Sequence, residues 1–382
     1  MKFAHLGDCH LGGWRQPELG QLNFESFRYA VNKCINEKVE FVLIAGDLFD
    51  SAYPPIETLK ETFHEFKRMK EADIPVFLIA GSHDYSASGK TFLDVLEKAG
   101  FCKNVSIFEE KDEKIILQPA IYKNFAIYGF PGKKSGMEVD ELERIKIQDC
   151  PGLFKILMLH TAIRDAVGTL PIKAINHLLL PKVDYIALAH LHIDYAKGNA
   201  VYSGPTFPNN LSELEELKGG SFYIINNGQV KKERINLKDI CVIEMEIKDA
   251  LNATEEIICN IKKQNVKDKI VILKLSGTLE KGKSSDIDFA KIEGLLKEAG
   301  AFVFLKSTTK LVLAESDIKI DIADSQNIEA QIIKKFEETS PSRFNIFIPS
   351  LIKALQLEKL EDEKSAVFED RLISETKKIL TI

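Results

Sequence analysis

The stretch FVLIAGDLFD, residues 41–50, runs from five uninterrupted apolar side chains into a glycine and an aspartate. Continuous apolarity over about four to eight residues is typical of a strand buried on both faces of a parallel sheet. Four other apolar runs also end at an Asp or His, namely KFAHL (2–6), VFLIA (76–80), FKILML (154–159) and YIALA (185–189). Because the carboxyl ends of parallel strands form the edge at which α/β proteins build their sites, we expect these polar side chains to meet there.

Amphipathic patterns separate these strands. Apolar side chains recur at helical spacing over 23–37 and 55–70, and a third pattern runs from Ser88 to Gly100, residue types that favour the two ends of a helix. A further apolar run, FAIYGF (125–130), predicts another strand. Strands that alternate with helices predict an α/β domain built in layers.

The pattern changes after residue 235. Apolar runs predict four further strands, at 240–247, 269–277, 301–307 and 310–316, with helical patterns at 252–264 and 286–299 between the first three. From about residue 325 the pattern is helical only. We therefore predict three parts: an α/β domain over 1–235, a small α+β domain over 236–322, and a linker with helices over 323–382.

Composition excludes several classes of protein. A chain of 382 residues with a net charge of −6 carries no overall basic footprint, so a nucleic-acid partner would have to be held by a local patch or by metal ions. The six cysteines form no CxxC pair, which argues against zinc-ribbon and thioredoxin chemistry and fits reduced thiols in a cytoplasm. The first residues do not resemble a signal peptide, and no apolar run approaches the ~18–20 residues of a membrane span. We expect a cytoplasmic protein with no membrane partner.

The polar residues at the strand ends point to a metal site. A single histidine after an apolar run is usually a hydrogen-bonded core or rim residue, and Asp47 by itself could form an Asx-turn. Five of the eight histidines, however, lie at these strand ends together with several aspartates. Asp and His are ligands of borderline-to-hard divalent metals. Their coincidence at one sheet edge therefore predicts a divalent metal centre.

Five short motifs at these strand ends resemble the signature of the calcineurin-like metallophosphoesterase superfamily. They are D-x-H (8–10), G-D-x-x-D (46–50), G-S-H-D (81–84), His160 and H-x-H (190–192). Over about 1–210, the residues in and around these motifs are most similar to those of the SbcD-type branch. Members of this branch are nucleases of double-strand-break repair that partner an SMC-like ABC ATPase. The resemblance implies a layered sandwich of two sheets flanked by helices, a small α+β capping domain, and C-terminal helices that dock on the ATPase. It also implies a homodimer.

The resemblance further implies two Mn²⁺ ions per chain. Asp8, His10 and His192 would hold the first ion and His160 and His190 the second, with Asp47 bridging the two. Between such ions a water molecule becomes nucleophilic near neutral pH and can attack a phosphodiester.

Ser82 departs from the superfamily pattern, which usually has an asparagine whose carbonyl oxygen ligates the second metal. A serine is shorter and offers only a hydroxyl. Because both residues are neutral, the charge of the site is unchanged. We hypothesise that the second metal is held more loosely and that the enzyme remains active.

His83 follows Ser82 and is assigned to no metal. The resemblance implies that it donates a hydrogen bond to the scissile phosphate or protonates the leaving oxygen. Asp50 could orient His83, as an aspartate orients the histidine of a catalytic triad, or it could cap the helix that follows. Tyr85 and Arg15 lie in loops beside the site and could bind DNA, although ordinary solvated loops carry such residues as well.

The function that the resemblance implies is that of a Mn²⁺-dependent DNA exonuclease and single-strand endonuclease acting on double-strand ends and single strands. A phosphoesterase for small molecules or phosphoproteins would share the ligands, and a non-catalytic DNA-end scaffold would share the fold. Amphipathic patterns at 351–360 and 365–380 predict two helices that would bind the ATPase partner or, alternatively, pack on their own domain.

Overall fold

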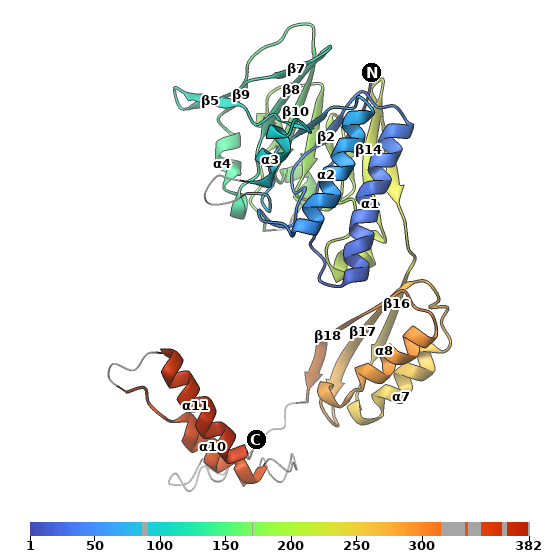
Figure 1. The fold of residues 1–382 in the computed structure, drawn as a ribbon, viewed down its shortest axis with the longest axis vertical. Helices are drawn as coiled ribbons and strands as arrows, with labels where there is room; N and C mark the ends of the chain where they lie inside the picture. The colour runs from blue at the N-terminus through green and yellow to red at the C-terminus, as the bar shows by residue number, and fades with distance from the viewer. Residues whose placement is uncertain (86–90, 170, 315–332, 335–344, 361–364, 381–382) are drawn as a thin grey trace. The chain divides into compact units, whose positions relative to one another are not determined.

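The computed structural model describes residues 1–382 apart from 86–90, 170, 315–332, 335–344, 361–364 and 381–382 (Figure 1). The chain forms two compact units, Met1–Val312 and Leu313–Ile382. The predicted boundaries at residues 235 and 322 remain predictions.

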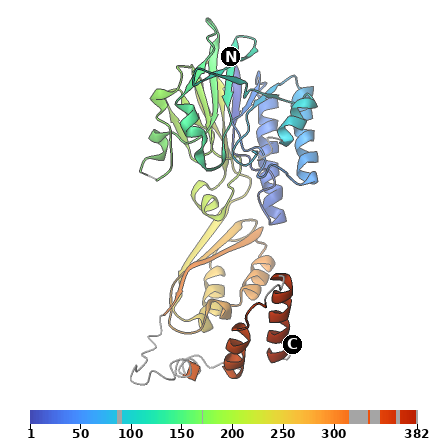
Figure 2. The same cartoon turned by 90° about the vertical axis from the view of Figure 1, so that its left-hand side faces the viewer.

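The first sheet of the larger unit has six strands among the described residues, in the order β15-β14-β1-β2-β3-β4. Four of them run parallel: β1 (Lys2–Leu6), β2 (Val42–Ile44), β3 (Val76–Leu78) and β4 (Lys103–Asn104). Two antiparallel strands, β14 (Gly220–Asn226) and β15 (Gln229–Ile235), complete it. Helices α1 (Pro17–Asn36), α2 (Ile56–Glu71) and α3 (Phe92–Lys98) cover its outer face, and α1 and α2 lie side by side in Figures 1 and 2.

The second sheet has the order β12-β13-β11-β10-β8-β7. Its parallel centre consists of β8 (Phe125–Phe130), β10 (Phe154–His160), β11 (Tyr185–Ala189) and β13 (Ala200–Tyr202). Antiparallel edges are β7 (Ala120–Tyr122) and β12 (Tyr195–Lys197). The outer face is covered by α4 (Glu138–Leu142) and a small sheet of β5 (Phe108–Lys111), β6 (Lys114–Leu117) and β9 (Ile145–Ile147). Short helices α5 (Arg164–Val167) and α6 (Leu211–Leu217) lie in loops.

The two sheets pack face to face on an aromatic core. Along β1 the side chains alternate, so that Phe3 points to the layer between the sheets and Leu6 to the helices on the outer face. Phe3 stacks on Phe41 with ring centroids 5.0 Å apart and meets Tyr185 of the opposite sheet edge-on at 5.4 Å. Because both faces of these strands are buried, they carry apolar residues at most positions. The predicted sandwich of two sheets flanked by helices is confirmed.

The segment after residue 235 forms a three-stranded sheet of β16 (Ile240–Glu246), β17 (Ile270–Leu279) and β18 (Val303–Leu313). Helices α7 (Ala250–Ile261) and α8 (Phe289–Glu298) cover one face. We call these five elements the α+β module. Its other face packs on residues of the sandwich, where Ile270 and Ile272 join a core cluster with Leu214.

Several boundaries differ from the sequence expectations. The strands predicted at 301–307 and 310–316 are one continuous strand, β18, because Ser307, Thr308 and Thr309 supply no turn and β-branched threonines favour extended backbone. Helix α1 begins at Pro17, six residues before the predicted start, since proline suits a first helical position. Helix α3 begins after Thr91, which forms a capping box, and 88–90 lie outside the described residues. Strand β14 was not among the predicted strands.

The smaller unit contains α10 (Ile348–Leu355) and α11 (Ser365–Leu380), which confirm the two predicted C-terminal helices, although α10 begins three residues earlier and ends sooner. The first part of the helical pattern predicted from about residue 325, over 327–338, lies outside the described residues except at 333–334. Within the part of the chain that the structure describes, no helix has both the length and the apolarity to cross a membrane.

The aromatic core yields a stability prediction. Phe3 is 0% exposed, and Phe3→Ala removes its contacts to both sheets, so the free energy of unfolding should fall by about 3–5 kcal/mol. Phe108→Ala is the matched control because that ring is 39% exposed, and it should cost clearly less. Urea unfolding followed by circular dichroism measures both. Equal losses would mean that the layer between the sheets is not a tightly packed core.

Candidate metal centre

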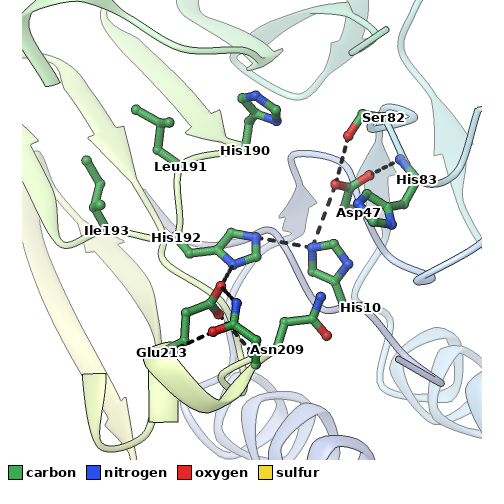
Figure 3. Close-up of a pocket in the computed structure, with 11 residues that line it drawn as sticks. His10, Asp47, Ser82, His83, His190, Leu191, His192, Ile193, Asn209 and Glu213 are labelled. Atoms are coloured by element: carbon green, nitrogen blue, oxygen red, sulfur yellow. Dashed lines mark hydrogen bonds and ion pairs between the residues drawn. The ribbon is translucent and has the colours of Figure 1, made fainter. Parts of the chain in front are cut away.

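The strand ends of both sheets meet at one cavity of about 410 Å³ (Figure 3). Its walls come from the loops after β1, β2, β3 and β11 and from the start of α6. The lining residues are His10, Asp47, Ser82, His83, His190, Leu191, His192, Ile193, Asn209, Asn210 and Glu213. Asp8 and His160 are buried within hydrogen-bonding or ion-pair distance of this set. The structure thus brings all the predicted metal residues to one place.

Unusual backbone conformations aim these side chains. Asp8, His10, Asp47 and His190 have φ of 49°, 43°, 50° and 96°, in the left-handed region that L-residues rarely adopt. Such residues cost about 1–3 kcal/mol each and cluster at functional sites, where the surrounding packing enforces them. Gly46 has φ 100°, and a Cβ there would lie 2.5 Å from Nδ1 of His160. The turn between β2 and the site therefore requires glycine.

Asp8, His10 and His192 form the first group of potential ligands, with one atom from each lying within 4.8 Å of the others. The Nε2 atoms of the two histidines face each other at 3.2 Å. Their Nδ1 atoms are held from outside, His10 by Asp50 Oδ1 at 3.1 Å and His192 by Glu213 Oε1 at 2.9 Å. A carboxylate behind a histidine fixes its orientation and tautomer and leaves Nε2 free, as in many metal sites.

Asp8, Asp47 and His160 form the second group. His160 Nδ1 is held by the carbonyl oxygen of Ala45 at 3.1 Å, and its Nε2 lies 3.1 Å from Asp47 Oδ2. This contact is an ion pair without hydrogen-bond geometry, so the buried Nε2 has no hydrogen-bond partner among the described residues. Asp47 Oδ2 is also 3.7 Å from Nε2 of His10, so this carboxylate lies between the two groups.

The electrostatics of the site favour positive charge. Burial opposes ionisation of Asp47, yet His160 and His10 outweigh it and hold the pKa of Asp47 below its ordinary value. Burial also lowers the pKa of His160, but Asp47 and Asp8 raise it to about 9. The carboxylates of Asp8 and Asp47 are 0% and 2% exposed, and imidazole nitrogens face them. This set fits divalent cations, whose positive charge would replace that of the proton on His160.

A family model supports this reading of the site. The model for the calcineurin-like phosphoesterase matches residues 1–194. The chain belongs to the calcineurin-like phosphoesterase family. It is thus a metal-dependent phosphodiesterase, and the family that the strand-end motifs predicted is confirmed.

Several proteins share most of the length of this calcineurin-like phosphoesterase. The DNA double-strand break repair protein Mre11 of Methanocaldococcus jannaschii is 27% identical, and the match covers 93% of this chain and 94% of that protein. Mre11 of Sulfolobus acidocaldarius is 28% identical over 77% of this chain and 79% of that protein. The uncharacterized metallophosphoesterase YhaO of Bacillus subtilis is 27% identical over 63% of this chain and 61% of that protein.

His190 occupies a different position from the other histidines of this phosphoesterase. Its backbone N–H donates to both carboxylate oxygens of Asp8 at 3.0 Å, and its ring meets that of His160 edge-on at 5.1 Å. Burial and the neighbouring His160 lower the pKa of His190. The ring therefore favours the neutral form, which a metal ligand requires. Ser82 donates from Oγ to Asp47 Oδ2 at 3.3 Å.

His83 lies at the mouth of the cavity with 46% of its side chain exposed. Its Nδ1 is 2.8 Å from the backbone carbonyl of Asp50 and 3.6 Å from the Asp50 carboxylate, which is closer to His10. Helix α2 begins at Ile56 with Pro55 at its N-cap, so the alternative role of Asp50 as a helix cap is wrong. Arg15 is exposed and Tyr85 half-buried, and neither lines the cavity.

Sequence reasoning missed two residues of the site and the role of a third. Glu213 and Asn209 hold His192 and Asp50, and neither belongs to a strand-end motif. Asp84 was recognised within G-S-H-D, but no role was given to it. Its fully buried carboxylate accepts from the backbone N–H groups of Leu48, Phe49 and Gly81 at 3.0–3.2 Å, which ties the loop after β2 to the loop after β3.

Asp84 provides a prediction about the framework of the site. Asp84→Ala would leave three buried N–H groups unpaired at about 1–3 kcal/mol each, so we expect a large drop in melting temperature and loss of metal binding. Asp84→Asn should lose less than Asp84→Ala. Its amide oxygen can still accept from Leu48 and Gly81, which share one carboxylate oxygen, whereas its NH2 group would face the N–H of Phe49 and leave that donor unpaired. Calorimetric unfolding measures both, and equal losses in the two variants would contradict this role.

Proposed function

We propose that this phosphoesterase is a Mn²⁺-dependent DNA nuclease of double-strand-break repair, with exonuclease activity at double-strand ends and endonuclease activity on single strands. The observation that carries the proposal is the pair of ligand groups that share Asp8 and meet at Asp47. The similarity to Mre11 proteins, which are DNA double-strand break repair proteins, supports the substrate class.

The donor set fits two divalent cations. Asp8, His10 and His192 would hold one, and His160 and His190 the other, with Asp47 bridging. The ligands are oxygens and imidazole nitrogens with no thiolate, which suits Mn²⁺. When bound, such ions neutralise phosphate oxygens and lower the pKa of water, which is the chemistry that phosphodiester hydrolysis requires.

His83 would act on the substrate directly. Its Nδ1 donates to the carbonyl of Asp50, which leaves Nε2 at the cavity mouth to face a phosphate. An imidazolium in this position can donate to the phosphate and then protonate the departing ribose oxygen. Asp50 would orient it through that carbonyl, while the Asp50 carboxylate steadies His10.

The remaining proposals concern partners. Residues 1–235 would form the nuclease domain, 236–322 the cap, and 323–382 the segment that binds an SMC-like ABC ATPase. Exposed apolar side chains on α10 and α11, including Leu355, Val367 and Ile373, support docking of these helices in a partner's groove.

Arg15 and Tyr85 would contact DNA. A homodimer and a cytoplasmic location, which the free cysteines favour, complete the proposal.

The first test is nuclease activity. The chain should degrade labelled linear and single-stranded DNA in Mn²⁺ faster than it turns over a nitrophenyl phosphodiester. Asp47→Ala should abolish degradation because it removes the carboxylate proposed to bridge the two ions. Preference for the small ester would favour the small-molecule alternative, and DNA binding without cleavage in excess Mn²⁺ would favour the scaffold.

His83→Gln separates chemistry from metal binding. Because a positioned general acid contributes about 10²–10⁴-fold, cleavage should fall at least about 100-fold while the Mn²⁺ dissociation constants stay within about 2-fold. Metal binding is followed by electron paramagnetic resonance of free Mn²⁺. Loss of bound metal in this variant would contradict the assigned role.

Ser82 yields a prediction about the second ion. Wild-type protein should show one tighter and one weaker Mn²⁺ constant, and Ser82→Asn should tighten the weaker one because an amide oxygen replaces a hydroxyl bound to Asp47. Ser82→Ala serves as the comparison. Two equal, tight constants that do not weaken in Ser82→Ala would contradict the hypothesis.

A further inference from the structure

Helix α6 touches two parts of the molecule at once. Its N-cap is Asn210, whose side-chain oxygen accepts from the N–H of Glu213, so the helix begins directly at the cavity wall. Consecutive residues on a helix point about 100° apart. Glu213, Leu214 and Glu215, which follow one another, therefore face different surroundings.

Toward the cavity, three neighbouring residues hold the carboxylate of Glu213. Its Oε1 pairs with His192 Nδ1 at 2.9 Å and accepts from Asn210 Nδ2 at 2.6 Å, while Oε2 accepts from the backbone N–H of Asn209 at 2.8 Å (Figure 3). The side chains of Glu213 and His192 are both 18% exposed. A carboxylate with so many fixed partners holds the imidazole in one orientation.

Toward the α+β module, Leu214 and Glu215 both contact strand β17. Leu214 is 0% exposed and packs in a cluster with Ile270 and Ile272 of β17. Glu215 accepts from Lys274 of the same strand at 2.7 and 2.8 Å. Because both side chains of this ion pair are half-buried, at 32% and 22% exposure, solvent screens it less than a surface pair.

We propose that α6 couples the docking of the α+β module to the metal centre, with Glu213 as a positioning residue for His192. Glu213, Leu214 and Glu215 lie within one turn of α6, so a displacement of β17 that moves Leu214 and Glu215 carries Glu213 with them. His192 Nε2 lies 3.2 Å from His10 Nε2, and a small rotation of the ring would open that ligand pair. A partner or substrate that shifts the module would thereby change the affinity for metal. The inference rests on the proposed role of His192 as a ligand.

The test measures Mn²⁺ affinity of the full chain by electron paramagnetic resonance, with melting temperature recorded in parallel. Glu213→Gln should weaken Mn²⁺ binding about 10-fold, within the range found for residues that orient metal ligands. Lys274→Met, which removes the cationic partner of Glu215 and also of Glu244 on β16 but keeps most of the side-chain stem, should weaken it about 3-fold, and Lys274→Arg should restore it. Lys291→Met is the matched control because Lys291 is paired with Glu255 elsewhere in the module, and it should change nothing.

The double variant Glu213→Gln/Lys274→Met decides whether the two sites act through one path. We expect it to bind Mn²⁺ no more weakly than Glu213→Gln alone, because that substitution has already removed the contact through which the module acts on His192. If Lys274→Met lowers the melting temperature but leaves the Mn²⁺ constants unchanged, the contact is packing only and the coupling is overturned, while the proposed nuclease function stands. If the wild-type chain binds no Mn²⁺, both the coupling and the proposed metal centre are wrong.

Discussion

The structure depends on two buried carboxylates, Asp8 and Asp47, held at the edge where two sheets meet. Each sits in a left-handed backbone conformation, and each is removed from water. Unpaired charges in such a place are costly, so the fold must supply positive charge to them. The same two carboxylates raise the pKa of His160 to about 9, which favours its charged form beside them. Divalent cations would meet the same need more fully, which explains why histidines and not lysines surround the pair.

The layers around this site are arranged so that it stays rigid. The aromatic core between the sheets fixes the relative positions of the strands, and Asp84 joins the loops after β2 and β3 through three backbone hydrogen bonds. Asp50 and Glu213 hold the two histidines of the first ligand group from behind. Preorganisation of this kind is what electrostatic catalysis requires, since ligands that must reorganise during the reaction lose much of their effect.

Much of this arrangement was predictable because its signals are local. A strand buried on both faces has a continuous apolar run, and its end is marked by glycine and a polar residue, as at Gly46-Asp47. Predictions failed where the extent or pairing of a strand depends on segments that are distant in the sequence. The Thr308–Thr309 segment carries no turn, so β18 continues, and β14 pairs antiparallel with β1 across more than 200 residues of sequence. Glu213 lies on a short acidic helix whose neighbouring glutamates look equivalent in sequence.

By itself, the amino-acid sequence determined which residues stand at the ends of buried strands and therefore the family, the type of ligand and the class of chemistry. Only the tertiary structure decided which of them face one another: that the carboxylate of Asp50 lies nearer His10 than His83, that Asp47 lies between the two ligand groups, and that α6 reaches from His192 to Lys274. The reason is physical. A polar residue at the end of a buried strand can be identified from its neighbours in the sequence. The partner of its side chain is instead set by the packing of segments that are distant along the chain.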